Sequence, residues 1–282
     1  MGKRSSPLRY PGGKARLYPY ISTLICQYFD KKPVYAEAFA GGFGAGIELL
    51  LNNKVDRVLI NDADICIYSF WKCVVSKHYH NRFVERIKTT PIDIQSWKKQ
   101  RALLKESGRL NTLDIGFATF FLNRCNRSGI LSANPIGGIN QNGNYRLDCR
   151  FNKDRLIELI EIIYERRSQI EVFNLDAHHF IKEMDRSIEN IFFMFDPPYV
   201  GAGPLLYKSN YDALKHQELS SLVQTLHNKW IMTYDDNKLV RNIYRTNTIR
   251  KYWIPYSLAT KRTAGELIIY DHRLLNPPKL KL

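Results

Sequence analysis

An unbroken apolar run is followed directly by Asp196-Pro197-Pro198-Tyr199. These four residues supply one carboxylate, two prolines and an aromatic ring. An ionised carboxylate and backbone carbonyls only accept hydrogen bonds, and the first proline offers no N–H donor. With the ring of Tyr199, this set suits a planar amino group, whose two N–H protons need two acceptors while its ring needs a stacking surface. The alternative is a strand that merely ends in a Pro-Pro turn. The rest of the chain must decide.

The elements that would position this turn follow from apolar patterning. The run at 191–195 predicts a strand buried on both faces, and its carboxyl end is where ligands bind in an open α/β sheet. Further strands are predicted at 34–39, 57–62, 170–176 and 229–234, with a closing hairpin made by 248–253 and 266–270. Helices are predicted at 15–29, across much of 65–109, around 117–122, at 153–167 and at 216–228.

A glycine-rich turn at residues 40–46 follows the first predicted strand and leads into a helix. This arrangement lets the backbone approach a ligand at the helix N-terminus. The next strand ends in Asp62, about 18 residues after the glycines, from where a carboxylate reaches a pair of ribose hydroxyls. Together these features favour an adenosine-containing cofactor over a plain tight turn.

A second turn near the start, Tyr10-Pro11-Gly12-Gly13-Lys14, is rigid at the proline and flexible at the glycines. The spacer and the Ser/Thr of a phosphate-binding P-loop are absent, so ATP binding through this turn is not expected. A carboxylate or phosphate clamp and a simple surface turn both remain open.

Net charge points to a polyanionic partner. The chain carries 42 Lys and Arg against 27 Asp and Glu, a net charge of +15, and no acid precedes Asp30. Nucleic acid is the simplest such partner, and a merely basic or ribosome-associated protein is the alternative. The five cysteines are scattered without a Cys-x-x-Cys pair, which argues against a metal site or a disulfide framework. With no apolar run near the ~20 residues of a membrane span and no evident secretory signal, we expect a cytoplasmic protein.

Residues 123–152 are rich in turn residues, amides and arginines, and Asn142-Gly143 predicts a hairpin. Arginine, asparagine and glutamine are the side chains that read guanine and adenine edges in a major groove. A solvated loop is the alternative, although roughly 30 such residues without function are unusual in a compact domain. The candidate nucleic-acid contacts are Arg124, Asn126, Arg127, Asn140, Gln141, Asn144 and Arg146, with Lys261 and Arg262 near the end of the chain.

Taken in order, these motifs resemble the Dam-like (D12 class) DNA adenine-N6 methyltransferases over nearly the whole chain. The matching pieces are Tyr10 to Lys14, Glu37 to Gly42, Asn61-Asp62, the basic insert and Asp196 to Tyr199. The resemblance implies an α/β, Rossmann-like S-adenosylmethionine-dependent methyltransferase fold with a mostly parallel seven-stranded sheet and one reversed strand. It also implies a mainly helical target-recognition insert with a hairpin or loop at 72–167, between catalytic parts at 1–71 and 168–282.

The same resemblance implies roles for individual residues. The cofactor is expected to be S-adenosylmethionine, bordered by Phe39 and Gly41. Asp62 would hold its ribose and Asp176 its adenine, while Tyr10 and Lys14 would close over its methionine end; Glu37 belongs to the same cofactor-binding set. Asp196, Pro197, Pro198 and Tyr199 would be the catalytic residues, acting on an adenine flipped out of double-stranded DNA, and no metal is expected.

Departures from the family pattern limit what carries over. Ala38 stands where the family usually has proline, and Phe43 interrupts the glycine pattern, which questions the path of that loop. Ser128 and Ser132 differ from GATC-recognising relatives, so the recognised sequence does not transfer. An RNA base N-methyltransferase and a catalytically inactive DNA-binding relative are the competing functions. A cognate restriction endonuclease is a candidate partner, and we expect a monomer.

Overall fold

A seven-stranded sheet forms the centre of the computed structural model, which describes residues 6–9, 13–105, 111–200, 211–257 and 261–280 (side chains at 254–257 and 261–264 excepted). The strands lie in the order β3-β2-β1-β4-β5-β7-β6, and β7 runs opposite to the other six, antiparallel to both β5 and β6. This confirms the expected mostly parallel sheet with one reversed strand. The strands are β1 (Val34–Glu37), β2 (Val58–Asn61), β3 (Ile170–Phe173), β4 (Ile191–Phe195), β5 (Lys229–Asp235), β6 (Ile249–Ser257) and β7 (Lys261–Tyr270).

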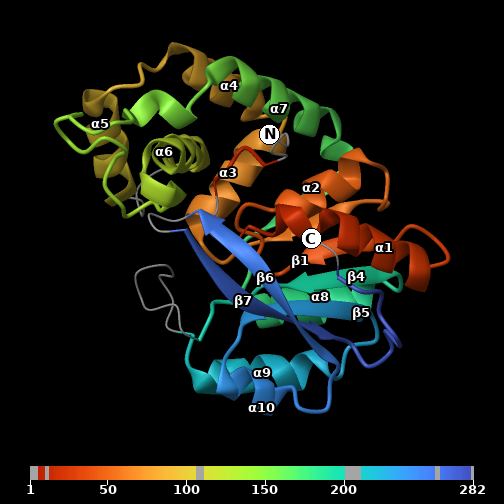
Figure 1. Ribbon diagram of the computed structural model, residues 1–282. Helices are drawn as coiled ribbons and strands as arrows, with labels where there is room; N and C mark the ends of the chain where they lie inside the picture. Colours follow the sequence, from red (N-terminus) through yellow and green to blue (C-terminus); the bar gives the residue numbers. More distant parts are fainter. Residues whose placement is uncertain (1–5, 10–12, 106–110, 201–210, 258–260, 281–282) are drawn as a thin grey trace.

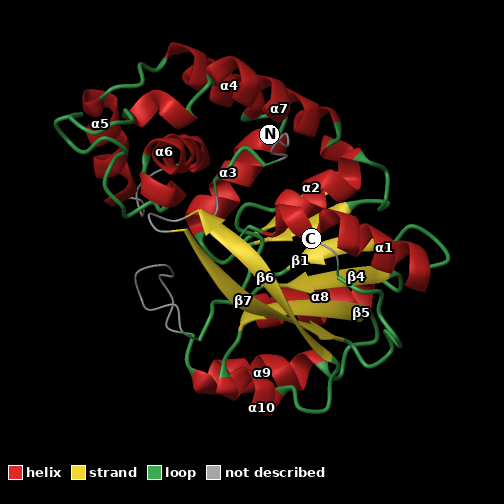
Figure 2. Cartoon of the chain, in the orientation of Figure 1, coloured by secondary structure: helices red, strands yellow, loops and turns green. Residues whose placement is uncertain are grey.

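Helices cover both faces of this sheet (Figure 1 and Figure 2). One face carries the first helices of the chain, and the other carries α8, α9 and α10. The helices are α1 (Tyr18–Tyr28), α2 (Gly44–Leu51), α3 (Ile65–Val75), α4 (His80–Thr89), α5 (Ile94–Lys105), α6 (Thr112–Cys125), α7 (Lys153–Glu165), α8 (Ala177–Ser187), α9 (Ala213–Val223) and α10 (Lys238–Ile243). Short 3-10 turns include η1 (Lys14–Leu17), η3 (Arg127–Gly129), η4 (Leu147–Arg150) and η5 (Arg167–Gln169).

The position of β4 in the sheet explains why all of its residues are apolar, without alternation of polar and apolar positions. Phe192 and Met194 belong to the hydrophobic core under α1, α2 and α3, whereas Phe193 and Phe195 belong to the core that holds α8 and α9. Because successive side chains of a strand point to opposite faces, a strand covered on both sides must be apolar at every position. The strand ends where the acid of Asp196 begins the site.

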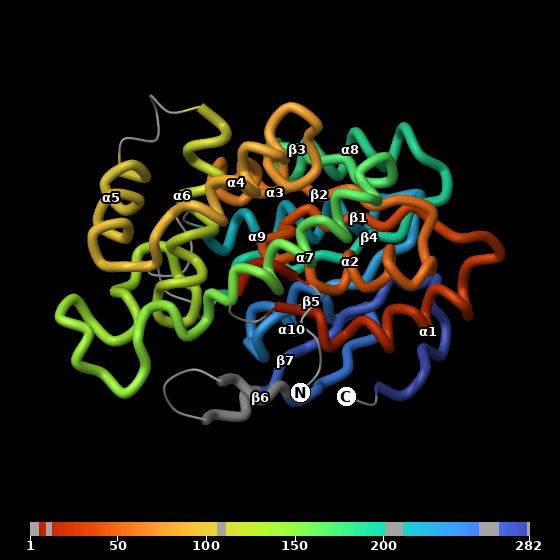
Figure 3. The backbone as a smooth tube through the Cα atoms, turned by 90° about the horizontal axis from the view of Figure 1, so that it is seen from above, coloured from red at the N-terminus to blue at the C-terminus, as the bar shows by residue number. Residues whose placement is uncertain are grey.

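Helices α4, α5 and α6 come between α3 and α7 in the chain and gather at one end of the molecule, beside the sheet (Figure 1 and Figure 3). Trp71 on α3 and Trp97 on α5 are both buried and belong to the hydrophobic core that includes these helices. The helical character of this segment agrees with the expected insert, whose boundaries at 72 and 167 remain a prediction.

The hairpin predicted at Asn142-Gly143 is wrong. Residues 137–146 form turns without a strand, and the polar residues around these two positions give a hairpin no apolar face to bury. The Gln141 amide organises this loop instead: its Nε2 donates to the carbonyls of Ile136 and Gly138, and its Oε1 accepts from the N–H of Leu147.

Asn61 fixes the ends of three adjacent strands, where the expected cofactor residues lie. Its fully buried amide donates to the carbonyl of Ala38 after β1 (3.0 Å) and to that of Leu175 after β3 (3.1 Å), and it accepts from the Leu175 N–H (3.0 Å). A buried amide with three bonds holds the three connections at a fixed separation.

Replacing Asn61 by alanine leaves buried backbone groups of Ala38 and Leu175 without their partner. We expect the free energy of unfolding to fall by about 2–3 kcal/mol, measured by urea denaturation. Asn190→Ala, an exposed asparagine before β4, is the control and should change stability by less than about 0.5 kcal/mol. Equal effects in the two variants would contradict the role of Asn61.

Candidate active site

A buried lysine joins two carboxylates at the carboxyl end of β4. The Lys14 ammonium at the start of η1 lies 3.1 Å from Oδ2 of Asp196 and 3.3 Å from Oε2 of Glu266 on β7. The Lys14 side chain is 5% exposed, that of Glu266 1% and that of Asp196 25%. Three segments far apart in the sequence therefore meet in one ion-pair cluster, and of its two acids only Asp196 reaches solvent appreciably.

Hydroxyl groups complete this cluster. The Tyr199 hydroxyl accepts from Lys14 Nζ at 2.7 Å and donates to Glu266 Oε1 at 2.8 Å. Tyr252 on β6 donates to Glu266 Oε2 at 2.5 Å, and Thr233 on β5 donates to Asp196 Oδ1 at 2.7 Å. Each carboxylate is thus oriented by bonds to both of its oxygens.

The pKa values follow from this packing. Burial raises the pKa of Asp196, the Lys14 charge opposes that rise, and the Glu266 charge adds to it. Burial alone would lower the pKa of Lys14, but the charges of Asp196 and Glu266 outweigh it, so the pKa of Lys14 is raised. Lys14 is therefore a permanent cation at neutral pH, whereas Asp196 can change its protonation state more readily.

The glycine-rich turn takes its path from Phe43, the residue that departs from the family pattern. Phe43 adopts a left-handed conformation (φ 46°) directly before α2, which is strained for a residue with a side chain. Its ring packs against Gly46, where a Cβ atom would lie 2.2 Å from the ring. Gly44 leaves room for Ala15 next to Lys14. The extra aromatic residue is thus accommodated by the glycines around it.

Asp62 lies beside this turn, as predicted. Its carboxylate accepts from the N–H of Gly41 and the N–H of Asp64, each at 2.9 Å, and the carbonyl of Gly41 accepts from the indole of Trp71. Burial raises the pKa of Asp62 to about 6, although the two N–H bonds lower it. The carboxylate retains lone pairs for two hydroxyl donors, as binding to a ribose requires.

Glu37 is buried at the end of β1 and accepts from the Tyr35 hydroxyl at 2.8 Å. Burial raises the pKa of Glu37 to about 8, with a smaller contribution from the charge of Asp196. At neutral pH this carboxyl is therefore mostly protonated and adds little negative charge to the site. Its predicted contact with the cofactor remains a prediction.

At the next strand end, Asp176 caps α8 by accepting from the N–H groups of His178 and His179, and its side chain is largely exposed. Phe39 packs edge-to-face on Tyr211, with ring centroids 6.0 Å apart. Phe39 follows β1 and Asp176 follows β3 at the carboxyl edge of the sheet, and their contact with the cofactor remains a prediction. Tyr10 lies outside the described residues.

The predicted nucleic-acid contacts divide into two groups. Arg127, Asn140, Asn144 and Arg146 have exposed side chains on the loop that follows α6. Asn126 is a correction: it is fully buried, accepts from the Trp97 indole, and donates to the carbonyls of Ile130 and Leu131. Gln141 is partly buried and its amide bonds also lie within the loop, so both amides shape the loop; contact of Gln141 with nucleic acid remains a prediction.

Arg124 is partly buried and connects the loop to other segments. Its guanidinium donates to the carbonyls of Arg150 and Pro7. Lys261 and Arg262 lie on β7, where the structure describes the backbone alone. Contact of these residues with nucleic acid remains a prediction.

Sequence reasoning missed Glu266, Thr233 and Tyr252. A usable signal existed for Glu266, because it is the one acid directly before the apolar run at 267–270 of a predicted strand. A charged residue inside a buried strand is rare unless it is paired. Thr233 and Tyr252 carry no comparable signal, since both are common strand residues.

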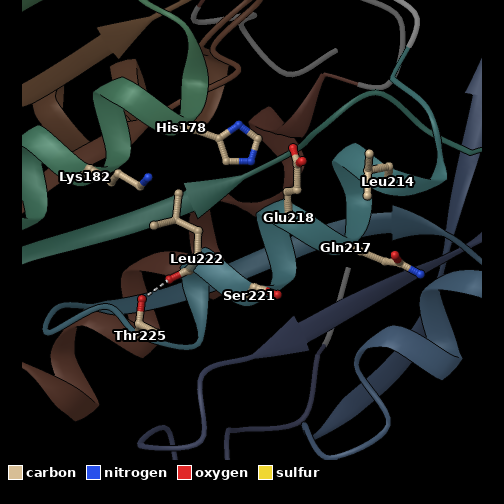
Figure 4. Close-up of a pocket in the computed structure, with 8 residues that line it drawn as sticks. All are labelled: His178, Lys182, Leu214, Gln217, Glu218, Ser221, Leu222 and Thr225. Atoms are coloured by element: carbon tan, nitrogen blue, oxygen red, sulfur yellow. Dashed lines mark hydrogen bonds between the residues drawn. The ribbon is translucent and has the colours of Figure 1, made fainter.

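A separate groove lies between α8 and α9 and does not include this cluster (Figure 4). Its lining residues are mostly polar side chains on the outer surfaces of the two helices: His178, Lys182, Leu214, Gln217, Glu218, Ser221, Leu222 and Thr225. None of them contacts Lys14, Asp196 or Glu266 through the interactions described above.

Comparison with protein families shows to which family the chain belongs. The family model of the D12 class N6 adenine-specific DNA methyltransferases matches residues 10–257. The chain belongs to this family. A comparison with curated proteins finds no match.

Two solved structures are similar to this D12-class chain. A SAM-dependent methyltransferase from Agrobacterium tumefaciens is 12% identical with a TM-score of 0.38; the similarity covers 92% of this chain but 61% of that protein, less than two thirds of its length. The rRNA methyltransferase aviRa from Streptomyces viridochromogenes is 10% identical with a TM-score of 0.38, covering 93% of this chain and 86% of that one.

Among the helices that the structure describes, none combines the length and the apolar character that a membrane span needs.

The methyl donor expected for a member of the D12 class is S-adenosylmethionine. The described residues fit this cofactor. Gly41 brings backbone close to the Asp62 carboxylate, the N-terminus of α2 follows the glycine turn, and Asp176 stands at the next strand end. We infer that Asp62 would hold the ribose and that the glycine turn would border the methionine portion.

The pKa of Asp62 gives a test of this inference. A carboxylate accepts from two hydroxyls better than a carboxylic acid does, so cofactor affinity should fall as the pH falls through about 6. Asp62→Asn should bind S-adenosylmethionine about 10- to 100-fold more weakly at pH 8, and its affinity should lose that pH dependence. Isothermal titration calorimetry from pH 5 to 8 measures both effects. Unchanged affinity in Asp62→Asn would contradict the assignment.

Proposed function

We propose that this protein is a site-specific DNA adenine-N6 methyltransferase that acts on a base flipped out of the duplex. The observation that carries the proposal is the geometry of Asp196: a partly exposed carboxylate at a strand end, oriented by Thr233 and Lys14, directly before two prolines and Tyr199. Membership in the D12 class supports adenine as the base and DNA as the substrate.

The chemical problem is the weak nucleophilicity of the target nitrogen. The lone pair of an exocyclic amino group is delocalised into the adenine ring. When the Asp196 carboxylate and the Pro197 carbonyl each accept one N–H, the nitrogen shifts toward tetrahedral geometry and its lone pair becomes available for in-line attack. The new nitrogen–carbon bond would form as the carbon–sulfur bond breaks, with the bonding pair left on sulfur, and the nitrogen would then release one proton to solvent. S-adenosylmethionine supplies the methyl group from its sulfonium centre.

Positioning supplies most of the rate enhancement in such a reaction. Tyr199 offers a ring for stacking against the extruded base, and its hydroxyl is held by Lys14 and Glu266. An adenine within the duplex stack is out of reach of a carboxylate at a strand end, so base flipping is required. Unstacking costs a few kcal/mol, which stacking on Tyr199 offsets in part.

The exposed side chains of the loop after α6 support binding to duplex DNA. Arg127 and Arg146 are suited to phosphates or guanine edges, while Asn140 and Asn144 are suited to adenine edges. The excess of positive charge supplies the sequence-independent part of the affinity. A cognate restriction endonuclease and a monomeric state stay part of this proposal, as does the division into two catalytic parts around residues 72–167.

Asp196→Ala separates chemistry from binding. We expect transfer of tritiated methyl groups to duplex DNA to fall by at least about a thousandfold, because the principal acceptor of the amino protons is lost. Duplex affinity should stay within about twofold, since phosphate contacts dominate it. Asp30→Ala, an exposed acid after α1, is the control and should keep wild-type turnover.

The same assay distinguishes the substrates. Methyl transfer should occur on adenine N6 of duplex DNA and not on structured RNA of matched length. Wild-type turnover in Asp196→Ala would contradict the mechanism, whereas transfer to RNA alone would contradict the substrate.

A further inference from the structure

Glu266 is a buried acid to which neither the family match nor the sequence motifs assign a role. It lies on β7, with Asp235 of β5 and Tyr252 of β6 as its partners in register on the two sides. The residues that follow it, Leu267 to Tyr270, are fully buried and apolar except for the hydroxyl of Tyr270. A carboxylate in such a strand is costly unless charged and hydrogen-bonding partners surround it.

Those partners all belong to the catalytic end of the sheet. Glu266 receives hydrogen bonds from the hydroxyls of Tyr199 and Tyr252 and pairs with the Lys14 ammonium. Lys14, Tyr199 and Glu266 form a closed triangle, because Lys14 also donates to the Tyr199 hydroxyl. The triangle fixes the hydroxyl end of the ring that the proposed mechanism uses for stacking.

The charges of the described residues explain why a second acid is useful here. The ion pairs join one ammonium to two carboxylates, and Glu37 with a pKa of about 8 is mostly uncharged at neutral pH. If Asp196 were the sole counter-ion of Lys14, the two charges would cancel, and the carboxylate would be held by the lysine. With Glu266 present, Lys14 retains a buried counter-ion when Asp196 turns toward another donor.

We propose that Glu266 is a positioning residue for methyl transfer: it pairs with the Lys14 ammonium and holds the Tyr199 hydroxyl, so that the Asp196 carboxylate is less tightly held by Lys14 and stays a strong acceptor for the amino protons of the substrate. The inference rests on the proposed function. Glu266 does not contact the substrate itself, since its side chain is 1% exposed behind Lys14 and Tyr199.

Glu266→Gln tests this role because it keeps the size of the side chain and removes its charge. We expect kcat to fall at least about tenfold, with Kd for duplex DNA unchanged within about twofold. The acid limb of the kcat–pH profile should also move to lower pH. The charge of Glu266 raises the pKa of Asp196, and its removal lets Asp196 ionise at lower pH.

Several titratable groups face Asp196, and their charges determine how the shift of the acid limb is interpreted. They are Lys14 from η1, Glu37 and the Tyr35 phenol from β1, Tyr234 from β5, and Glu266 from β7. Only Glu266 changes in the variant, so a moved limb reports its charge. A residue with a merely structural role would lower kcat without moving the limb.

Two further variants complete the experiment. Glu266→Asp keeps the charge and should restore the wild-type position of the acid limb, with kcat between those of wild type and Glu266→Gln. If Glu266→Gln fails to fold, as judged by circular dichroism, Glu266→Asp still gives a test, because its limb must coincide with that of wild type. Glu189→Gln, an exposed acid before β4, is the control and should leave kcat and the limb unchanged.

The outcomes separate this inference from the proposed function. An active wild type whose kcat survives Glu266→Gln within about twofold, or whose limb stays in place, overturns the role of Glu266 alone. A wild type that methylates no adenine in DNA overturns the proposed function, and this inference with it. A lower kcat together with a limb at lower pH supports both.

Discussion

The ion pairing of Lys14 with Asp196 and Glu266 is the interaction on which the site depends. A buried ammonium is stable only beside negative charge, and these two carboxylates lie far from each other and from Lys14 in the sequence. Their meeting therefore requires the N-terminal turn, the end of β4 and the middle of β7 to be correctly packed at once. The reversed direction of β7 also contributes to this packing. Because β7 runs antiparallel to β5, Glu266 lies opposite Asp235, which comes after Thr233 on β5.

A second constraint organises the cofactor side of the sheet. Parallel strands end at one edge, and the Asn61 amide binds the connections that follow β1 and β3 at that edge. Asp62 and Gly41 then meet through one hydrogen bond of 2.9 Å. Backbone geometry thus arranges the residues proposed to bind the cofactor, whereas buried charge arranges the residues proposed to be catalytic, and the two arrangements respond differently to pH. Burial raises the pKa of Asp62 to about 6, whereas the neighbouring carboxylates raise the pKa of Lys14, which keeps its charge.

The strands of the sheet could be predicted from the sequence because each one is marked by a local pattern, an apolar run followed by an acid or a turn. The apolar run of β4 ends at Phe195 as predicted, and the acids at 62, 176 and 196 follow their strands as predicted. The hairpin at 142–143 was wrong since a two-residue turn signal needs flanking apolar alternation, which this loop lacks. Glu266 was missed because its importance comes from partners more than 50 residues away in sequence, Tyr199 among them, and a local pattern does not encode such pairing. Asn126 and Gln141 illustrate the same limit: amides that suit base edges equally suit the carbonyls of their own loop.

The most direct test of the central claim is long-read sequencing of genomic DNA from a methylation-free host that expresses this chain. We expect N6-methyladenine at one recurring sequence motif, and we expect it to disappear when Asp196→Ala is expressed at the same level. Genomic DNA without a modified adenine, from cells that contain folded protein able to bind S-adenosylmethionine, would contradict the assignment of DNA as the substrate.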